Sequence, residues 1–310
     1  MEKLSYFFID DVIWVMRDIA RQKPASIFDN AFMSVLKKAH DEYGLTVQLN
    51  LFYRTDFFYG TDEFTLSDMP DTYKAEFEAN ADWLRLAFHA KQEFPDYPYV
   101  NATYEDVKHD YELIVGEIKR FAGEKVVSTA LCPHWLPISR KGCHALADCG
   151  VRIVTPSAGD RKPYEGDPTV LPYGHAARLL QNRQPETMLF TRGGANKAIS
   201  ASVSGYNHLE TKDIAPIRFK NASHLDEETG LRFRGLSGGP CLNLYTLDGV
   251  RESLEKLIAA DHEYIGVATH EQYFYKDYYV YQPDYDEKIY LMAKMLHDAG
   301  YRFVTCDELL

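Results

Sequence analysis

Short apolar runs alternate with amphipathic stretches along the first half of the chain. The runs are rich in Val, Ile, Phe and Tyr and end at polar residues, which is typical of strands. The stretches between them place apolar residues three and four positions apart, as Val12, Val15 and Ile19 do, which predicts helices. Strands are predicted at residues 6–9, 45–53, 83–88, 126–131 and 151–155, helices at about 12–23, 26–44, 103–122 and 139–149, and a loop with a short helix at 54–80.

The alternation stops between about residues 156 and 240 and then resumes. This segment is rich in Gly, Pro, Asn and charge, which predicts an insertion of loops and short strands over the carboxyl ends of the barrel or sheet strands. Repeated strand–helix alternation predicts an α/β fold with parallel strands, either a barrel or an open sheet, in a single domain over 1–310. Beyond the insertion, helices are predicted at 248–260 and 284–299 and strands at 264–269 and 301–305.

The charge balance and the cysteines narrow the class of protein. Asp and Glu number 46 against 34 Lys and Arg, which gives a net charge of −12, and no basic run occurs. Such an acidic chain argues against nucleic acid or an anionic membrane as a partner. No apolar run reaches the roughly eighteen residues of a membrane span, and the run at 6–9 is too short for a signal peptide. The five scattered cysteines form no CxxC pair, so we expect free thiols in a cytoplasmic protein.

Polar residues suited to chemistry follow several of the predicted strands. Because parallel strands bring their carboxyl ends together, these residues are expected to lie at one end of the fold. Asp11 alone also fits a helix cap, and a lone histidine also fits core packing. Two adjacent carboxylates at a buried strand end, however, need a cation or a proton. The residues at these ends are Asp10, Asp11, Tyr53, Arg54, His89, Cys132, Pro133, His134, His270 and Glu271.

Five segments, in this order along the chain, resemble the polysaccharide deacetylases, also called family 4 carbohydrate esterases or NodB-type domains. The likeness spans residues 6–155 and 248–310, and leaves the insertion aside. The segments are Phe7-Phe8-Ile9-Asp10-Asp11, Leu86-Ala87-Phe88-His89, Leu131-Cys132-Pro133-His134-Trp135, Ala268-Thr269-His270-Glu271 and the closing stretch from Ala299 to Leu309.

The resemblance implies a distorted (β/α)7-like barrel that holds one divalent metal ion, zinc in the first place, with nickel or cobalt as alternatives. It implies that Asp11 and His89 are metal ligands. Asp10 would be the general base that deprotonates a metal-bound water, and His270 the general acid that protonates the leaving amine.

The sequence departs from the family pattern at two places. A second metal histidine is absent about four residues after His89, so Asp96, His134 or Glu93 must complete the ligand set, in that order of preference. The arginine expected before Pro133 is also absent, so another group must orient the base. Three further residues at the strand ends are expected to contact substrate, namely Arg54, Trp135 and Glu271.

Three functions are compatible with these residues. The first is a metal-dependent hydrolase that removes an acyl group, an acetyl group in the first place, from a small saccharide or a related amide. The second is a metal-dependent sugar isomerase or epimerase, which would normally place a lysine or further carboxylates at these strand ends. The third is a saccharide-binding protein without catalytic activity on a degenerate deacetylase barrel.

Overall fold

Strand β1 (Lys3–Val12) is buried along most of its length and has partners on both edges. It pairs in parallel with β2 (Val47–Phe52) on one edge and with β8 (Tyr264–His270) on the other, and β2 pairs with β3 (Leu84–Ala90). The computed structural model describes residues 2–55, 63–94, 98–99, 102–135, 138–155, 223–278 and 280–310.

A second sheet joins the first into a barrel. It has the order β4 (Ala130–Leu131), β5 (Ile153–Val154), β7 (Arg232–Arg234), and β6 (Ser223–Leu225) lies antiparallel on β7. A parallel bridge between Leu86 and Val127 connects β3 to the residues before β4, and one between Cys241 and Ala268 connects the residues after β7 to β8. The ring therefore runs β8-β1-β2-β3-β4-β5-β7 and back to β8, which confirms the predicted distorted (β/α)7-like barrel.

Side chains of β1 alternate between two apolar layers. Tyr6 and Phe8 belong to an inner cluster with residues of β4, β5 and β8, so they fill the barrel. Phe7 and Ile9 pack in the larger layer between the strands and the helices. Burial on both faces explains why the strand reads as a continuous apolar run. The amino-terminal end of the barrel is closed by the last residues of the chain, where β9 (Tyr301–Phe303) pairs with the start of β1 and η8 (Cys306–Leu309) joins the inner cluster.

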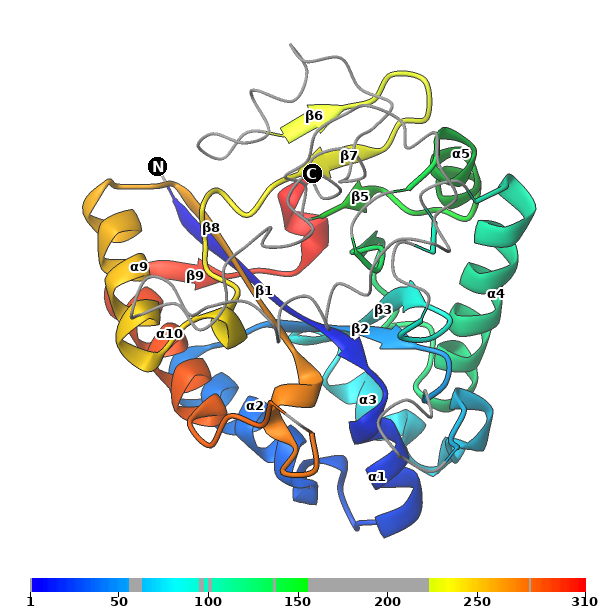
Figure 1. The fold of residues 1–310 in the computed structure, drawn as a ribbon, viewed down its shortest axis with the longest axis horizontal. Helices are drawn as coiled ribbons and strands as arrows, with labels where there is room; N and C mark the ends of the chain where they lie inside the picture. Colours follow the sequence, from blue (N-terminus) through cyan, green and yellow to red (C-terminus); the bar gives the residue numbers. More distant parts are fainter. Residues whose placement is uncertain are drawn as a thin grey trace.

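The helices surround the barrel, with α2, α9 and α10 on one side and α4 and α5 on the other (Figure 1). A capping box opens α4, since Thr103 Oγ1 accepts from the backbone N–H of Asp106 and the Asp106 carboxylate accepts from the backbone N–H of Thr103. Gly44 ends α2 in the left-handed conformation that favours glycine. The helices are α1 (Trp14–Gln22), α2 (Ala31–Tyr43), α3 (Lys74–Ala79), α4 (Tyr104–Phe121), α5 (Arg140–Asp148), α9 (Leu247–Ala259) and α10 (Tyr285–Asp298); the short 3-10 helices are η1 (Ile27–Asp29), η3 (Leu66–Asp68), η4 (Asp71–Tyr73), η6 (Leu242–Leu244) and η7 (Glu271–Phe274).

The structure moves several predicted boundaries. The first strand continues to Val12, so Asp10 and Asp11 lie inside it and the first helix begins at Trp14 rather than at Val12. Strands β4 and β5 form shorter ladders than the apolar runs predict. The barrel resumes at β7, before residue 240, and residues 156–222 of the predicted insertion lie outside the described residues. Within the described part of the chain, no helix is long and apolar enough to cross a membrane.

Candidate metal centre and active site

Asp10 and Asp11 lie at an irregularity of β1. The register of β1 against β2 shifts between Ile9 and Val12, and Asp11 has a φ of 62°. A regular strand would turn neighbouring side chains to opposite faces, whereas a bulge redirects one of them. Both carboxylates consequently approach His89, with Asp10 Oδ1 at 3.7 Å from its Nδ1 and Asp11 Oδ1 at 3.0 Å from its Nε2. A left-handed aspartate is a strained conformation of the kind that collects at functional sites.

Three donor atoms converge beside this bulge. His89 Nδ1 lies 2.5 Å from the carbonyl oxygen of Cys132, which can only accept, so Nδ1 carries the proton and Nε2 the lone pair. By the same reasoning His134 Nε2 donates to the Glu93 carbonyl at 2.9 Å, and its Nδ1 carries a lone pair. The two lone-pair nitrogens lie 3.1 Å apart, and Asp11 Oδ1 lies 3.0 Å from His89 Nε2 and 3.2 Å from His134 Nδ1. These three atoms are called the donor triangle.

This triangle fits a divalent metal ion. Two imidazole lone pairs and a carboxylate oxygen at such distances repel one another unless a cation or a proton lies among them. Zinc bonds to nitrogen and oxygen are about 2.0–2.2 Å long, so the edge of a tetrahedral ligand set is about 3.3–3.6 Å. The edges found here, 3.0–3.2 Å, are slightly shorter. Asp11, His89 and His134 are all buried, and each histidine is oriented by a carbonyl that accepts from its other nitrogen.

The two aspartates differ in their surroundings. Burial raises the pKa of Asp10 to about 6; His89 and Asn50 oppose this rise, and Asp11 adds to it. Burial alone would also raise the pKa of Asp11, but the histidines around it, His270 first, hold that pKa well below its usual range. Asp11 therefore has the character of a fixed anion, and Asp10 that of a group able to exchange a proton.

His270 faces the same centre from β8. It pairs with Asp10 in the strand register, and its Nε2 lies 4.0 Å from Asp11 Oδ2. Its Nδ1 lies 2.9 Å from Oδ1 of Asn243 in η6. That amide oxygen also receives the thiol of Cys241 at 3.1 Å, which supports its assignment as the acceptor. His270 thus donates from Nδ1 and turns Nε2 toward the donor triangle.

Two of the predicted substrate contacts follow strands at the carboxyl end of the barrel. Arg54, which follows β2, donates from Nε to Gln92 Oε1 at 2.5 Å and is partly exposed. Trp135 is partly exposed beside His134, with ring centroids 6.1 Å apart, and has a φ of 60°. Their roles toward a substrate stay predictions.

The three candidates for the third metal ligand differ in their position relative to Asp11 and His89. His134 lies in the donor triangle, as described above. Asp96 lies outside the described residues, so its preferred rank stays a prediction. Glu93 lies behind His134, with its Oε1 3.9 Å from His134 Nε2 and its Oε2 accepting from Gln272 at 3.0 Å. The geometry supports His134 over Glu93.

The structure contradicts the prediction that Glu271 contacts substrate. It follows His270 directly, yet its carboxylate is fully buried and accepts the backbone N–H groups of Ile13, Trp14 and Val15 at 2.6–2.8 Å. It thus satisfies the first donors of α1 and ties the end of β8 to the end of β1. Burial raises the pKa of Glu271 to about 7, and these backbone groups act against the rise. A strand-end position does not reveal whether a side chain points into the site or toward a neighbouring helix.

We expect Glu271→Gln to lower the free energy of unfolding by about 2–3 kcal/mol, because an amide cannot accept at both ends and a charge-assisted bond is lost. Urea unfolding of both proteins measures the difference. The control is Glu252→Gln, at an exposed position of α9, with an expected change below about 0.5 kcal/mol. Equal midpoints for Glu271→Gln and the wild type would contradict the capping role.

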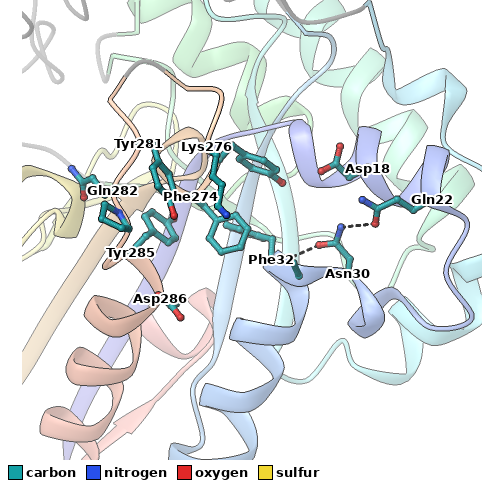
Figure 2. Close-up of a pocket in the computed structure, with 13 residues that line it drawn as sticks. Asp18, Gln22, Asn30, Phe32, Phe274, Lys276, Tyr281, Gln282, Tyr285 and Asp286 are labelled. Atoms are coloured by element: carbon teal, nitrogen blue, oxygen red, sulfur yellow. Dashed lines mark hydrogen bonds between the residues drawn. The ribbon is translucent and has the colours of Figure 1, made fainter.

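A pocket of about 440 Å³ lies outside the barrel, between α1, α2, η7 and α10. Figure 2 shows Phe274, Tyr281 and Tyr285 on one side and Asp18, Gln22 and Asn30 on the other. None of the donor-triangle residues lines it. One lining residue does reach the centre indirectly, since Gln282 donates to the backbone carbonyl of Asn243 at 2.8 Å.

Neither Asn243 nor Asn50 was expected from the sequence. Asn50 is fully buried in β2, and its Nδ2 lies 2.7 Å from Asp10 Oδ1. A signal existed for it, because Gln48 and Asn50 are polar residues at alternate positions of an otherwise apolar strand, and such positions share one face. Asn243 has no comparable pattern around it.

Comparison with known proteins gives structural matches alone. No protein-family model matches the chain, and no curated protein matches it. Among solved structures, the 4-alpha-glucanotransferase of Thermococcus litoralis is 10% identical with a TM-score of 0.52, over 100% of this chain and 40% of that one.

Two similar structures are carbohydrate esterases. The Xyl-CE4 domain of a multidomain xylanase from the hindgut metagenome of Trinervitermes trinervoides is 11% identical (TM-score 0.47; 100% of this chain, 90% of that one). A family 4 acetyl xylan esterase from Clostridium thermocellum, in complex with a cobalt ion, is 12% identical (TM-score 0.46; 99% and 90%). At 10% identity, the likeness to the glucanotransferase concerns the fold alone.

Proposed function

We propose that this chain is a metal-dependent hydrolase that removes an acyl group, an acetyl group in the first place, from a saccharide or a related amide. The observation that carries the proposal is the donor triangle of Asp11, His89 and His134, flanked by a second carboxylate and a further imidazole. Asp10 and His270 divide acid and base roles between two sides of one centre. All five residues lie in the segments that resemble deacetylases, and the resemblance implies metal or catalytic roles for four of them, Asp10, Asp11, His89 and His270.

In this proposal Asp11, His89 and His134 hold one zinc ion, with nickel or cobalt as alternatives that suit the same ligands. The bound ion would lower the pKa of a water molecule and polarise the acyl oxygen. Asp10 would accept a proton from the attacking water as the water oxygen adds to the acyl carbon. His270 then donates a proton from Nε2 to the leaving nitrogen or oxygen as the bond to the acyl carbon breaks, which yields a carboxylic acid and a free amine or alcohol.

The surroundings fit such a division of labour. His270 is more exposed than Asp10, with 17% of its side chain accessible, as expected of a group that meets a leaving sugar. Trp135 and Arg54 lie at the same end of the barrel, and we propose them as substrate contacts, the indole as a face for a sugar ring. All five cysteines are thiols, and we propose a reducing, cytoplasmic compartment on that basis.

Acetate release tests the function. The protein is stripped with a chelator, reloaded with zinc, cobalt or nickel, and incubated with N-acetylated chito-oligosaccharides and O-acetylated xylo-oligosaccharides. We expect acetate from at least one substrate in the loaded protein and none in the stripped one. Metal-loaded protein that binds these sugars without releasing acetate would contradict the proposal and favour a binding function.

His270→Ala should retain zinc and lower the rate of acetate release roughly 10²-fold, within the range for acid–base groups. The alkaline limb of the pH–rate profile should disappear, because that limb reports deprotonation of the group that protonates the leaving atom. The measurements are zinc content and kcat across pH. A variant that keeps the alkaline limb would remove His270 from the acid role.

A further inference from the structure

Asp10 is held by a single strong hydrogen bond. Its Oδ1 accepts from Nδ2 of Asn50 at 2.7 Å, while its Oδ2 has a weaker contact with the Cys132 thiol at 3.5 Å. Asn50 is fully buried, and Asp10 is 6% exposed. One carboxylate oxygen is therefore tied inside the barrel by an amide, and the other contacts a thiol, which is a weak donor.

The orientation of the Asn50 amide is fixed by the neighbouring Gln48 amide, whose own orientation follows from its partners. Gln48 Nε2 lies 3.1 Å from the carbonyl oxygen of Ala130, which can only accept, so this atom is the nitrogen of the amide. Its oxygen then accepts the Ser128 hydroxyl at 2.6 Å, and its nitrogen also donates to Asn50 Oδ1 at 2.7 Å. The atom of Asn50 that faces Asp10 must consequently be Nδ2, a donor.

The row of hydrogen bonds from Ser128 through Gln48 and Asn50 to Asp10 extends further, to the closed end of the barrel. Ser128 Oγ lies 2.8 Å from Cys306 Sγ in η8, and since the hydroxyl donates to Gln48, the thiol donates to the hydroxyl. Each donor in the row Cys306, Ser128, Gln48, Asn50 points toward Asp10. Aligned dipoles reinforce one another in a buried setting, and they end on the carboxylate.

We propose that Asn50 is the positioning residue of the base, holding Oδ1 so that Oδ2 is directed at the water that attacks the acyl carbon. This rests on the proposed function. Without the tie, the carboxylate is free to rotate, and its Oδ1, which lies 3.7 Å from His89 Nδ1, can turn toward that N–H group. A carboxylate turned toward that N–H group no longer faces the attacking water, so the effect belongs to kcat.

The test compares Asn50→Leu, which keeps the branching of the side chain and removes the donor, with Ser5→Ala. Ser5 is a buried polar residue on the same strand as Asp10 and donates to Ile265 O, away from the site. For zinc-loaded Asn50→Leu we expect kcat of acetate release to fall about 10- to 100-fold, with KM and the zinc Kd within about threefold of wild type. Ser5→Ala should match the wild type within about twofold.

Unchanged kcat in folded, zinc-loaded Asn50→Leu would overturn the inference, as would a fall in zinc affinity that accounts for the whole loss. If Asn50→Leu does not fold, Asn50→Ala replaces it with the same criteria. If the wild type releases acetate from no substrate, the proposed function fails, and crystal structures of the zinc-loaded proteins decide the positioning separately. An Asp10 carboxylate that keeps its orientation without the amide would refute it.

Discussion

His89→Ala is expected to abolish zinc binding and, with it, acetate release. His89 Nε2 is at the corner of the donor triangle that lies closest to both Asp11 and His134, so its loss leaves two donors for the ion. Because loss of an outer-shell partner of a metal ligand already costs about 10- to 100-fold in affinity, loss of the ligand itself should cost more than about 100-fold.

Two measurements check this result without activity. Zinc at about a thousand times the wild-type Kd should stabilise the wild type by about 4 kcal/mol and raise its Tm, whereas the same zinc concentration should stabilise His89→Ala by less than about 1.4 kcal/mol. Elemental analysis after dialysis gives the zinc content directly. His144→Ala is the matched control, since His144 lies on α5 with 41% of its side chain exposed and pairs with Glu228. Zinc retained by His89→Ala at wild-type stoichiometry would disprove the ligand assignment.

Asp10→Asn should keep the zinc and lose turnover by about two to four orders of magnitude, the usual contribution of a general base. The amide has the same shape, and its oxygen can still accept from Asn50, so the local structure should persist. What it loses is the ability to take a proton from water. The measurements are zinc titration and kcat at saturating substrate.

Asp110→Asn serves as the control for removal of a partly buried carboxylate, because Asp110 lies on α4 and accepts from Tyr99. It should turn over like the wild type. An Asp10→Asn enzyme with full turnover would exclude Asp10 as the base, and one that lost its zinc would make Asp10 a ligand instead.

The order of strands and helices could be predicted because apolar periodicity follows directly from burial. The ends of β1 could not, since Asp10 and Asp11 interrupt the apolar run while the backbone continues through them as strand and bulge. Polar residues after an apolar run suggest the end of a strand, but here Asp10 and Asp11 form a site within the strand. Residues 126–131 show the converse, because burial extends beyond the ladder of β4.

The carboxylates and histidines of the candidate site could be predicted, because such residues are rare inside a barrel. Its amides could not, although Gln48 and Asn50 interrupt one face of β2. Glu271 is predicted to contact substrate because it follows His270, but sequence adjacency does not fix the direction of a side chain. The open N-terminus of α1 attracts the Glu271 carboxylate instead. Asn243 follows a stretch without periodicity, so tertiary structure alone brings it to His270.

The pairing of β1 with β8 has a consequence for the order of assembly. Ser5 donates to Ile265 across a separation of 260 residues, so a ribosome adding about 5–20 residues per second leaves β1 without this partner for on the order of ten seconds or more. Asp11, His89 and His134 all precede residue 135, whereas His270 arrives with β8. During synthesis, the ion-binding half of the centre is therefore complete in sequence long before the proton donor, and closure of the barrel is the step that unites them.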